Sequence, residues 1–460
     1  MINDKKIHGV FKITPITPIH ISDGEKYQIF EYYIENKNFY LKDVFKFFQE
    51  NYQNLDAALK IIEDLSFRLS PEYIRYTLPV FATPQERQKT TSVAQLKSSG
   101  DYLKPVSSKH TKLDPSMEKI KKQAQQKQQQ STPQQVRPSA PISQPTEEVF
   151  SFIKDPFGQP FIPGSSLKGC LRTAITYYLL KSLNINIPNK ILDTIFRNQE
   201  QQNQRQKNKN SQRTLLNYII PLNDVKYDLF KALVIRDSSP FPLIDTESKI
   251  KTINNFAICQ IQIAKKKNNS IDSQGGIILG ECLLPNTTIE IPFYIDTFIL
   301  ERIIGTAEAE AKKKEKPAIL DKFRDNKKIF EKLREILSSQ DNIKNALLSF
   351  SSALIESQKD FFNITDYDSN LKQLKFEQAK NNEILLQLGF GTGYLSKTIA
   401  LVYPPEKRIE IQKELHLGIG RNYTIDNPFP RSRKLITTKE HIQPSVPLGW
   451  FKLEIEKRQP

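Results

Sequence analysis

The sequence contains few of the residues that build metal centres and disulfide frameworks. Its 460 residues include only five histidines and three cysteines, Cys170, Cys259 and Cys282. The cysteines form no C-x-x-C pair and the histidines no H-E-x-x-H spacing, which excludes a structural zinc or a disulfide scaffold. Long apolar runs are also missing, since nowhere do about 18 apolar residues follow one another and residues 1–9 lack an apolar stretch. We therefore expect a cytoplasmic protein without a membrane span.

Acidic residues are outnumbered by basic ones. The chain has 67 Lys and Arg against 51 Asp and Glu, a formal net charge of +16 at pH 7. A strongly basic balance favours a polyanionic partner, with nucleic acid ahead of an anionic membrane surface. The length permits two or three domains. These bounds indicate a multidomain protein that binds nucleic acid.

Strand and helix patterns alternate irregularly along the chain, which predicts an α+β fold. Apolar residues among Thr and Pro predict strands from Lys6 to Tyr40, and helical spacing follows from Lys42 to Phe67. Residues 298–362 form the most helical part. Residues 85–148 have almost no periodicity and include nine glutamines from Lys121 to Gln144. This segment is expected to be a long disordered Gln/Pro-rich insertion.

The strongest local motif is FIPGSSLKG, from Phe161 to Gly169, followed by an apolar helix. A serine at the turn is expected to cap this helix, and the exposed amides with nearby basic side chains suit a phosphate. The spacing is not that of a P-loop. A capped helix with basic residues in solvent is the alternative. The candidate phosphate-binding residues are Gly164, Ser165, Ser166, Lys168 and Arg172.

A second motif, LGFGTGYL, joins a strand from Leu385 to a helix that carries Lys397. Gly389, Gly391 and Gly393 let the backbone approach a ligand closely. One interpretation is a phosphate-binding loop. Another is an S-adenosylmethionine-dependent methyltransferase with Glu410 as the ribose-binding acid, but the short, proline-rich remainder of the chain leaves little room for such a fold.

The C-terminal part adds a basic, glycine-containing stretch suited to a sugar-phosphate backbone. Its candidate RNA-binding residues are Arg421, Arg431, Arg433 and Lys434, with Tyr423, Phe429 or Tyr394 available to stack on bases. A basic surface loop is the alternative. The single tryptophan, Trp450, lies in an alternating strand and is expected in the core.

Catalytic candidates are few. His20 beside the turn at Ser22 is a possible general base of a ribonuclease, although a lone histidine at a strand end is more often structural. Asp23 and Asp155 are each capable of binding a metal ion, but neither has an obvious carboxylate partner in sequence. Metal-dependent RNA cleavage therefore remains an alternative function.

Several segments in the same order resemble the RAMP superfamily of CRISPR effector subunits, and within it most closely the fifth subunit of type III-A (Csm) complexes. The motif FIPGSSLKG alone is typical of the superfamily, whereas the ordered set and its PLGW ending are typical of that subunit. The matching segments are residues 17–25 (TPIHISDGE), 161–172, 234–240 (VIRDSSP), 389–398, 430–434 and 447–450.

The resemblance implies a ferredoxin-like core, related to RNA-recognition folds. To this core the sequence pattern adds the helical insertion and the long disordered insertion, which is larger than expected for the family. The implied domains are an N-terminal RAMP domain of residues 1–84 and 149–245, and a C-terminal RAMP-like domain of residues 246–460. The segment that contains Arg236 joins the candidate RNA-binding residues on this basis.

The implied function is a non-catalytic subunit that caps the 3′ end of the CRISPR RNA and supports assembly and guide maturation. Its implied partners are the CRISPR RNA, target RNA, other RAMP backbone and small subunits of a type III complex, and recruited nucleases, but no membrane. No cofactor is expected. Mg²⁺ is required only under the alternative of a RAMP backbone subunit that cleaves target RNA.

Overall fold

A computed structural model describes most of the chain outside a few internal segments. The described residues are 6–64, 68–80, 148–183, 225–247, 250–267, 270–273, 277–285, 287–313, 317–362, 383–414, 430, 432–436 and 446–458. The predicted disordered insertion therefore lies outside the described residues, apart from Glu148. Arg421, Arg431, Tyr423 and Phe429 also lie outside them.

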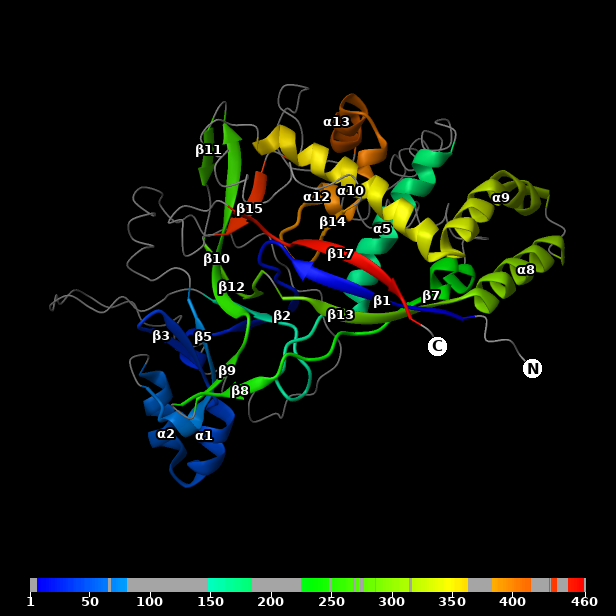
Figure 1. The fold of residues 1–460 in the computed structure, drawn as a ribbon. Coiled ribbons are helices and arrows are strands. Elements are labelled where there is room, and N and C mark those ends of the chain that lie inside the picture. Colours follow the sequence, from blue (N-terminus) through cyan, green and yellow to red (C-terminus); the bar gives the residue numbers. More distant parts are fainter. Residues whose placement is uncertain are drawn as a thin grey trace.

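A five-stranded antiparallel sheet, called here the central sheet, joins the two ends of the chain (Figure 1). Its middle strand β1 pairs with β13 on one side and with β17 on the other, so that Phe11 lies opposite both Ile291 and Ile455. The strand order is β14 (Ile384–Gln387), β17 (Trp450–Lys457), β1 (Lys6–Pro15), β13 (Ile289–Asp296) and β7 (Leu233–Ile235).

Two further sheets extend from this layer. The second sheet is built around the long strand β10 and has the order β16 (Val446–Pro447), β15 (Ser432–Ile436), β10 (Phe256–Lys267), β12 (Ile278–Leu283), β6 (Val149–Phe152) and β2 (Ser22–Tyr27), with β11 (Ser270–Ser273) paired to β10. The third sheet has the order β3 (Tyr32–Glu35), β4 (Asn38–Lys42), β5 (Ile74–Pro79), β9 (Lys251–Ile253) and β8 (Leu243–Asp245).

Helices cover the central sheet and the third sheet separately. In Figure 1, α5 and α10 lie over the central sheet with α8 and α9 beside them, while α1 and α2 form a small lobe on the third sheet. Tyr177 of α5 packs against Phe350 of α10, with ring centroids 5.3 Å apart. The helices are α1 (Val44–Glu50), α2 (Leu55–Glu63), α5 (Gly164–Ser182), α8 (Thr297–Lys313), α9 (Pro317–Leu337), α10 (Gln340–Phe362), α12 (Tyr394–Lys397) and α13 (Pro405–Glu414).

The mixed α and β content predicted from the sequence is confirmed. The expected helical segment at 298–362 corresponds to α8, α9 and α10. Trp450 is fully buried, as its alternating strand predicts. The proposed division at residue 245 remains a prediction, and the central sheet takes β1 and β7 from one side of it and β13, β14 and β17 from the other.

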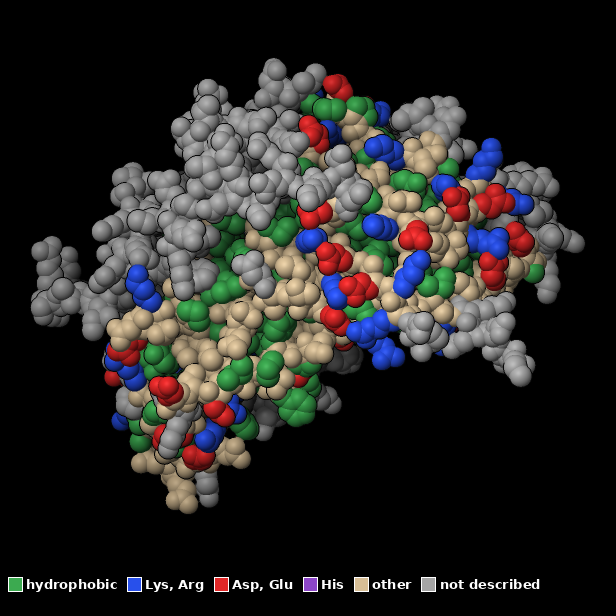
Figure 2. All heavy atoms as spheres, viewed as in Figure 1, with side chains coloured by type: hydrophobic (Ala, Val, Ile, Leu, Met, Phe, Trp, Pro, Cys, Tyr) green, Lys and Arg blue, Asp and Glu red, His purple; other side chains and the backbone are tan. Residues whose placement is uncertain are grey.

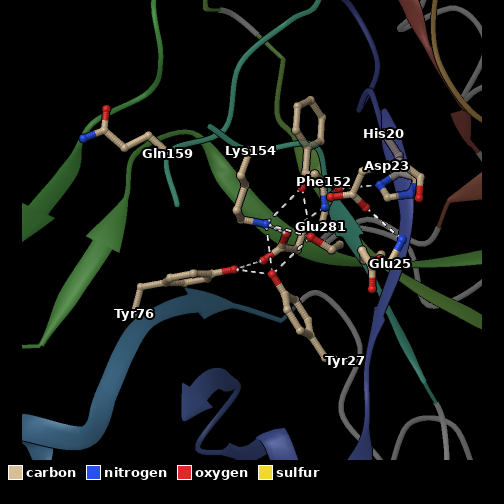
Figure 3. Close-up of polar contacts among 12 residues, drawn as sticks. His20, Asp23, Glu25, Tyr27, Tyr76, Phe152, Lys154, Gln159 and Glu281 are labelled. Atoms are coloured by element: carbon tan, nitrogen blue, oxygen red, sulfur yellow. Dashed lines mark hydrogen bonds and ion pairs between the residues drawn. The ribbon is translucent and has the colours of Figure 1, made fainter. Parts of the chain in front are cut away.

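A buried ionic network joins the second and third sheets (Figure 3). The Glu281 side chain on β12 is 1% exposed and forms an ion pair with the Lys154 ammonium. Glu281 also accepts hydrogen bonds from the Tyr76 hydroxyl on β5 and, at 2.8 Å, from the Phe152 amide. Lys154 donates a hydrogen bond of 2.9 Å to the Tyr27 hydroxyl. The Tyr27 and Tyr76 hydroxyl oxygens in turn lie 2.9 Å apart. One carboxylate thus holds strands of two sheets together.

Lys154 keeps its charge within the network. Burial alone lowers the pKa of Lys154, but the Glu281 carboxylate and the Tyr27 oxygen outweigh burial and hold the pKa above its ordinary value. Burial and the same carboxylate raise the pKa of Tyr76, so its hydroxyl stays protonated as a donor. Removing one partner of such a pair leaves an uncompensated charge in the interior, which is strongly unfavourable.

We expect Glu281→Gln to destabilise the protein by about 3–5 kcal/mol, because the Lys154 ammonium then stays buried without its counter-charge. Urea unfolding of the full chain measures the change. The control is Glu456→Gln, which removes an exposed partner of Lys12 and should change stability by less than about 1 kcal/mol. If the two substitutions lowered stability equally, the buried Glu281–Lys154 pair would not have the structural role given to it here.

Candidate nucleic-acid interface

Three of the sequence motifs meet at one junction. The Gly449 amide donates to the Pro18 carbonyl at 2.9 Å, and the Trp450 amide donates to the Thr17 hydroxyl at 2.8 Å. The Phe390 amide donates to the His20 carbonyl at 2.7 Å. Backbone hydrogen bonds therefore join the TPIH, GFGTG and PLGW segments, which are far apart in the sequence.

The glycine loop, residues 389–393, needs glycine for two reasons. Gly389, Gly391 and Gly393 all have positive φ, between 78° and 89°, which disfavours side chains. A Cβ added to Gly389 would also lie 2.2 Å from the His20 carbonyl oxygen, whereas at Gly393 no atom lies within 4 Å. Close packing against the His20 backbone thus explains why residue 389 is a glycine, whereas a side chain at residue 393 would meet only the strain of its positive φ.

Two lysines from different elements lie beside the glycine loop. Lys434 on β15 places its Nζ 3.5 Å from the ring centroid of Phe390. Burial and then the charge of Lys397 lower the pKa of Lys434 to about 8. Burial also lowers the pKa of Lys397, at the end of α12. Lys434 is half-buried and Lys397 is exposed, and two ammonium groups that repel each other form a site that an anion would stabilise.

Arg433 is structural. Its Nε donates to Gln358 Oε1 at 2.7 Å, and its Nη1 donates to the Pro430 carbonyl at 2.8 Å. Burial lowers the pKa of its guanidinium to about 10. Arg433 therefore joins β15 to α10, and Lys434 is the residue of this stretch that reaches the glycine loop.

The expected helix at the IPGSSLKG motif is present as α5, but the expected serine cap is not. The N-cap is Pro163, without a side-chain cap, and Ser165 and Ser166 lie in the first turn. The capping anion comes from a distant residue, because the Gly164 amide donates to Asp237 Oδ1 at 2.7 Å. This prediction was wrong because a carboxylate from the chain's own VIRDSS segment already occupies the first amide of the helix.

The basic side chains on α5 differ in their availability. Arg172 donates to Asp228 Oδ2 at 2.9 Å and packs over the Phe230 ring at 4.8 Å, so it supports the helix. Lys168 is half-buried, and burial lowers its pKa while Asp228 opposes this shift. Arg236 is exposed. Among the described candidates, Lys168 and Arg236 remain available near this helix, whereas Arg172 is held by its ion pair.

The catalytic candidates have structural roles. His20 is fully buried, its Nδ1 lies 2.7 Å from the Glu281 carbonyl oxygen, and burial lowers its pKa to about 4, so the ring is neutral and screened from water. Asp155 Oδ1 accepts from the Phe157 and Gln159 amides, both at 2.9 Å, which closes a turn. Burial raises the pKa of Asp23, whose Oδ1 accepts from the Glu25 amide. Among the described residues, no three His, Cys, Asp or Glu side chains cluster as a metal site.

The methyltransferase alternative does not fit the fold. Strand β14 leads into the glycine loop, but it is an edge strand and pairs antiparallel with β17. The helix after the loop, α12, has four residues. Glu410, the proposed ribose-binding acid, forms an ion pair with Lys407 on α13. A doubly wound parallel sheet would be required for that function.

Figure 2 shows how charge is distributed on one face of the molecule. Basic and acidic side chains are interspersed there over the strands and helices, so the positive net charge is not gathered into one patch on this face. Opposite charges also pair across neighbouring strands of the central sheet, for example Lys12 on β1 with Glu456 on β17 at 2.7 Å. None of the helices in the described part of the chain is long and apolar enough to span a membrane.

Sequence comparison identifies one family and several relatives. The model of the RAMP superfamily matches residues 12–396. A protein of Methanocaldococcus jannaschii called CRISPR system Cms protein Csm5 is 25% identical over 457 residues, which cover 96% of this chain and 87% of that protein. The protein of the same name from Streptococcus thermophilus is 27% identical over 243 residues, 52% of this chain. The alignment spans about half, 54%, of the Streptococcus protein.

Solved structures share the fold at low identity. A chain of a cryo-EM structure of a Csm-crRNA-target RNA ternary complex from a type III-A CRISPR-Cas system has a TM-score of 0.57 at 18% identity. The match covers 97% of this chain and 100% of that one. The crystal structure of T. onnurineus Csm5 has a TM-score of 0.53 at 17% identity, with 96% and 99% covered.

We expect Gly389→Ala to destabilise the protein by more than about 2 kcal/mol, because the added methyl group combines backbone strain with a clash. Gly393→Ala, at the same φ with open space around it, should cost only about 1–2 kcal/mol of backbone strain. Urea unfolding compares the two variants. An equal loss in both would show that the contact with His20 does not matter.

The lowered pKa of Lys434 predicts a pH dependence of RNA binding. A bound phosphate favours the protonated amine, so affinity is full below about pH 8 and falls by up to about tenfold per pH unit above it. Titrations of single-stranded RNA between about pH 7 and about pH 9 at constant ionic strength measure this. Lys434→Arg keeps its charge and should remove the dependence; persistence of the dependence in that variant would assign it to another group.

Proposed function

Because the chain belongs to the RAMP superfamily, we propose that it is an RNA-binding subunit of a type III CRISPR effector complex, equivalent to Csm5. Two kinds of similarity support this function. The relatives that match half or more of the chain carry the name Csm5, and a structural neighbour that matches nearly all of it comes from a complex with crRNA and target RNA. The partners would be a CRISPR RNA, target RNA and other subunits of a cytoplasmic ribonucleoprotein.

The central sheet supports the proposal of a ferredoxin-like core. In that fold the second, third, first and fourth strands lie in this order. Here β7, β13, β1 and β17 are neighbours in the matching order, with α5 between β1 and β7 in sequence and α8 to α10 between β13 and β17. β14 would then be an added edge strand.

The observation that carries the RNA-binding role is the convergence of Lys434 and Lys397 on the glycine loop. Lys434 on β15 places its Nζ 3.5 Å from the Phe390 ring centroid, and Lys397 lies at the end of α12, the helix that directly follows the loop. A sugar-phosphate backbone at the loop would neutralise two ammonium groups that otherwise repel each other. Because phosphate contacts carry no sequence information, such a site suits a guide of any sequence.

In this role the subunit performs no chemistry. It would cap the 3′ end of the guide, support assembly of the complex and take part in guide maturation through recruited nucleases. The bonds of Asp155 within its own turn and the burial of His20 favour this reading over cleavage.

The alternative is metal-dependent cleavage of target RNA through Asp23, whose side chain is exposed although its Oδ1 accepts a hydrogen bond from the Glu25 amide. Incubating the purified complex with complementary RNA and Mg²⁺, with chelator as the control, separates the two functions. We expect Asp23→Ala to leave the cleavage pattern unchanged. A cut that depends on both Mg²⁺ and Asp23 would favour the endonuclease.

The proposed function predicts that the tagged chain, purified from its own cells at low salt, carries small RNAs derived from CRISPR repeats. We expect the double variant Lys397→Ala and Lys434→Ala to retain at least about tenfold less RNA at moderate salt, with a salt dependence of binding shallower by about two phosphate contacts. Sequencing and quantification of the bound RNA measure both effects.

The matched control is Lys457→Ala, which removes an exposed lysine at the end of β17 that pairs with Asp341 of α10. This variant should retain RNA as the unmodified chain does. Recovery of the unmodified protein free of RNA would contradict the proposed function, and equal retention by all variants would place the RNA elsewhere.

A further inference from the structure

Two phenylalanine rings from distant segments lie together beside the glycine loop. Phe150 is on β6 and Phe390 lies between the first two glycines of the loop. Their ring centroids are 6.0 Å apart and their planes differ by 22°. Both side chains are half-buried, which leaves part of each ring accessible to solvent. They form a nearly parallel pair at the edge of the core.

Each ring carries a lysine ammonium on its face. Lys434 Nζ lies 3.5 Å from the Phe390 centroid, and Lys26 Nζ lies 4.9 Å from the Phe150 centroid. Lys26 also forms an ion pair with Glu148. The π face of an aromatic ring attracts a cation, but it can equally accept a flat nucleobase. The lysines thus cover surfaces that suit a second kind of ligand.

The pair has a rigid support beneath it. The His20 ring stands nearly perpendicular to both, at 5.7 Å from Phe390 and 6.3 Å from Phe150. His20 itself is fixed by the Glu281 carbonyl oxygen, and its backbone carbonyl holds the Phe390 amide. A platform oriented in advance loses little entropy when a ligand binds.

We propose that Phe150 and Phe390 form a base-stacking platform for single-stranded RNA, an inference that rests on the proposed RNA-binding function. A nucleobase takes the place of the Lys434 ammonium on the Phe390 ring, and the released lysine contacts a neighbouring phosphate. The lowered pKa of Lys434 is consistent with this exchange, because its ammonium regains full charge stabilisation on leaving the ring. Aromatic rings flanked by lysines match a base with its phosphate, whereas an acidic peptide would use the lysines alone.

The test measures binding of the full-length protein to a labelled single-stranded RNA of about 12 nucleotides. Phe390→Leu keeps an apolar side chain but removes the ring. We expect it to weaken binding by about tenfold or more without changing the salt dependence. Lys434→Gln should instead make the salt dependence shallower by about one phosphate contact. Thermal unfolding establishes that each variant is folded, and Phe150→Leu provides a second variant for the same platform.

Two controls isolate the stacking contact. Phe157→Leu changes a side chain that is 80% exposed but belongs to a turn outside the platform, and it should bind RNA normally. RNAs with a single abasic position, moved along the strand, remove one base while keeping every phosphate. For the unmodified protein and for Phe390→Tyr, the RNA that is abasic at one particular position should bind about tenfold more weakly than the intact RNA. For Phe390→Leu, the abasic and intact RNAs should bind equally well, because the ring that stacks on the base is already missing.

The outcomes separate this inference from the proposed function. If the unmodified protein binds no RNA, the proposed function and the platform both fail. If it binds RNA but Phe390→Leu matches Phe157→Leu and no abasic position weakens binding, the platform alone is wrong. The platform is established if removing one defined base weakens RNA binding only when the aromatic ring at residue 390 is present.

Discussion

The buried carboxylate of Glu281 is the constraint on which the other contacts depend. Its side chain holds Lys154 and the Phe152 amide in the second sheet and Tyr76 in the third, while its backbone oxygen holds His20. Through His20 the same residue determines where the glycine loop lies, because the Phe390 amide is bonded to the His20 carbonyl. A buried polar network of this kind fixes geometry more than it adds net stability. The position of the glycine loop is therefore set by the buried polar contacts of Glu281 and His20.

The start of α5 and the glycine loop differ in whether their positive charges already have anionic partners. At the start of α5 the chain supplies its own anion, Asp237, and pairs Arg172 with Asp228. At the glycine loop, burial and then the charge of Lys397 lower the pKa of Lys434. A helix N-terminus whose first amide already has a carboxylate partner is stabilised little by a bound phosphate. Two ammonium groups that repel each other would be stabilised much more. The second cluster is therefore where an external polyanion contributes most.

Local patterns predicted the elements better than their contacts. The apolar spacing of residues 298–362 and the alternation around Trp450 depend on neighbours in sequence, so these predictions hold. The serine cap failed because Asp237, 73 residues after Gly164, takes that role. Phe150 carried no signal at all, since only folding brings it against Phe390. Long-range pairing of this kind is not encoded in the spacing of a motif.

The position of β1 between β13 and β17 has a consequence for synthesis. Both partner strands, β13 and β17, are synthesised long after β1. Phe11 therefore lacks its neighbours Ile291 and Ile455 until late in synthesis. At about 5–20 residues per second, a ribosome releases the last partner many seconds after the first strand emerges. Until then the two edges of β1 are open to wrong pairing. The central sheet is thus completed only after β17 has been made, and a nascent chain would benefit from a chaperone that shields its first strand.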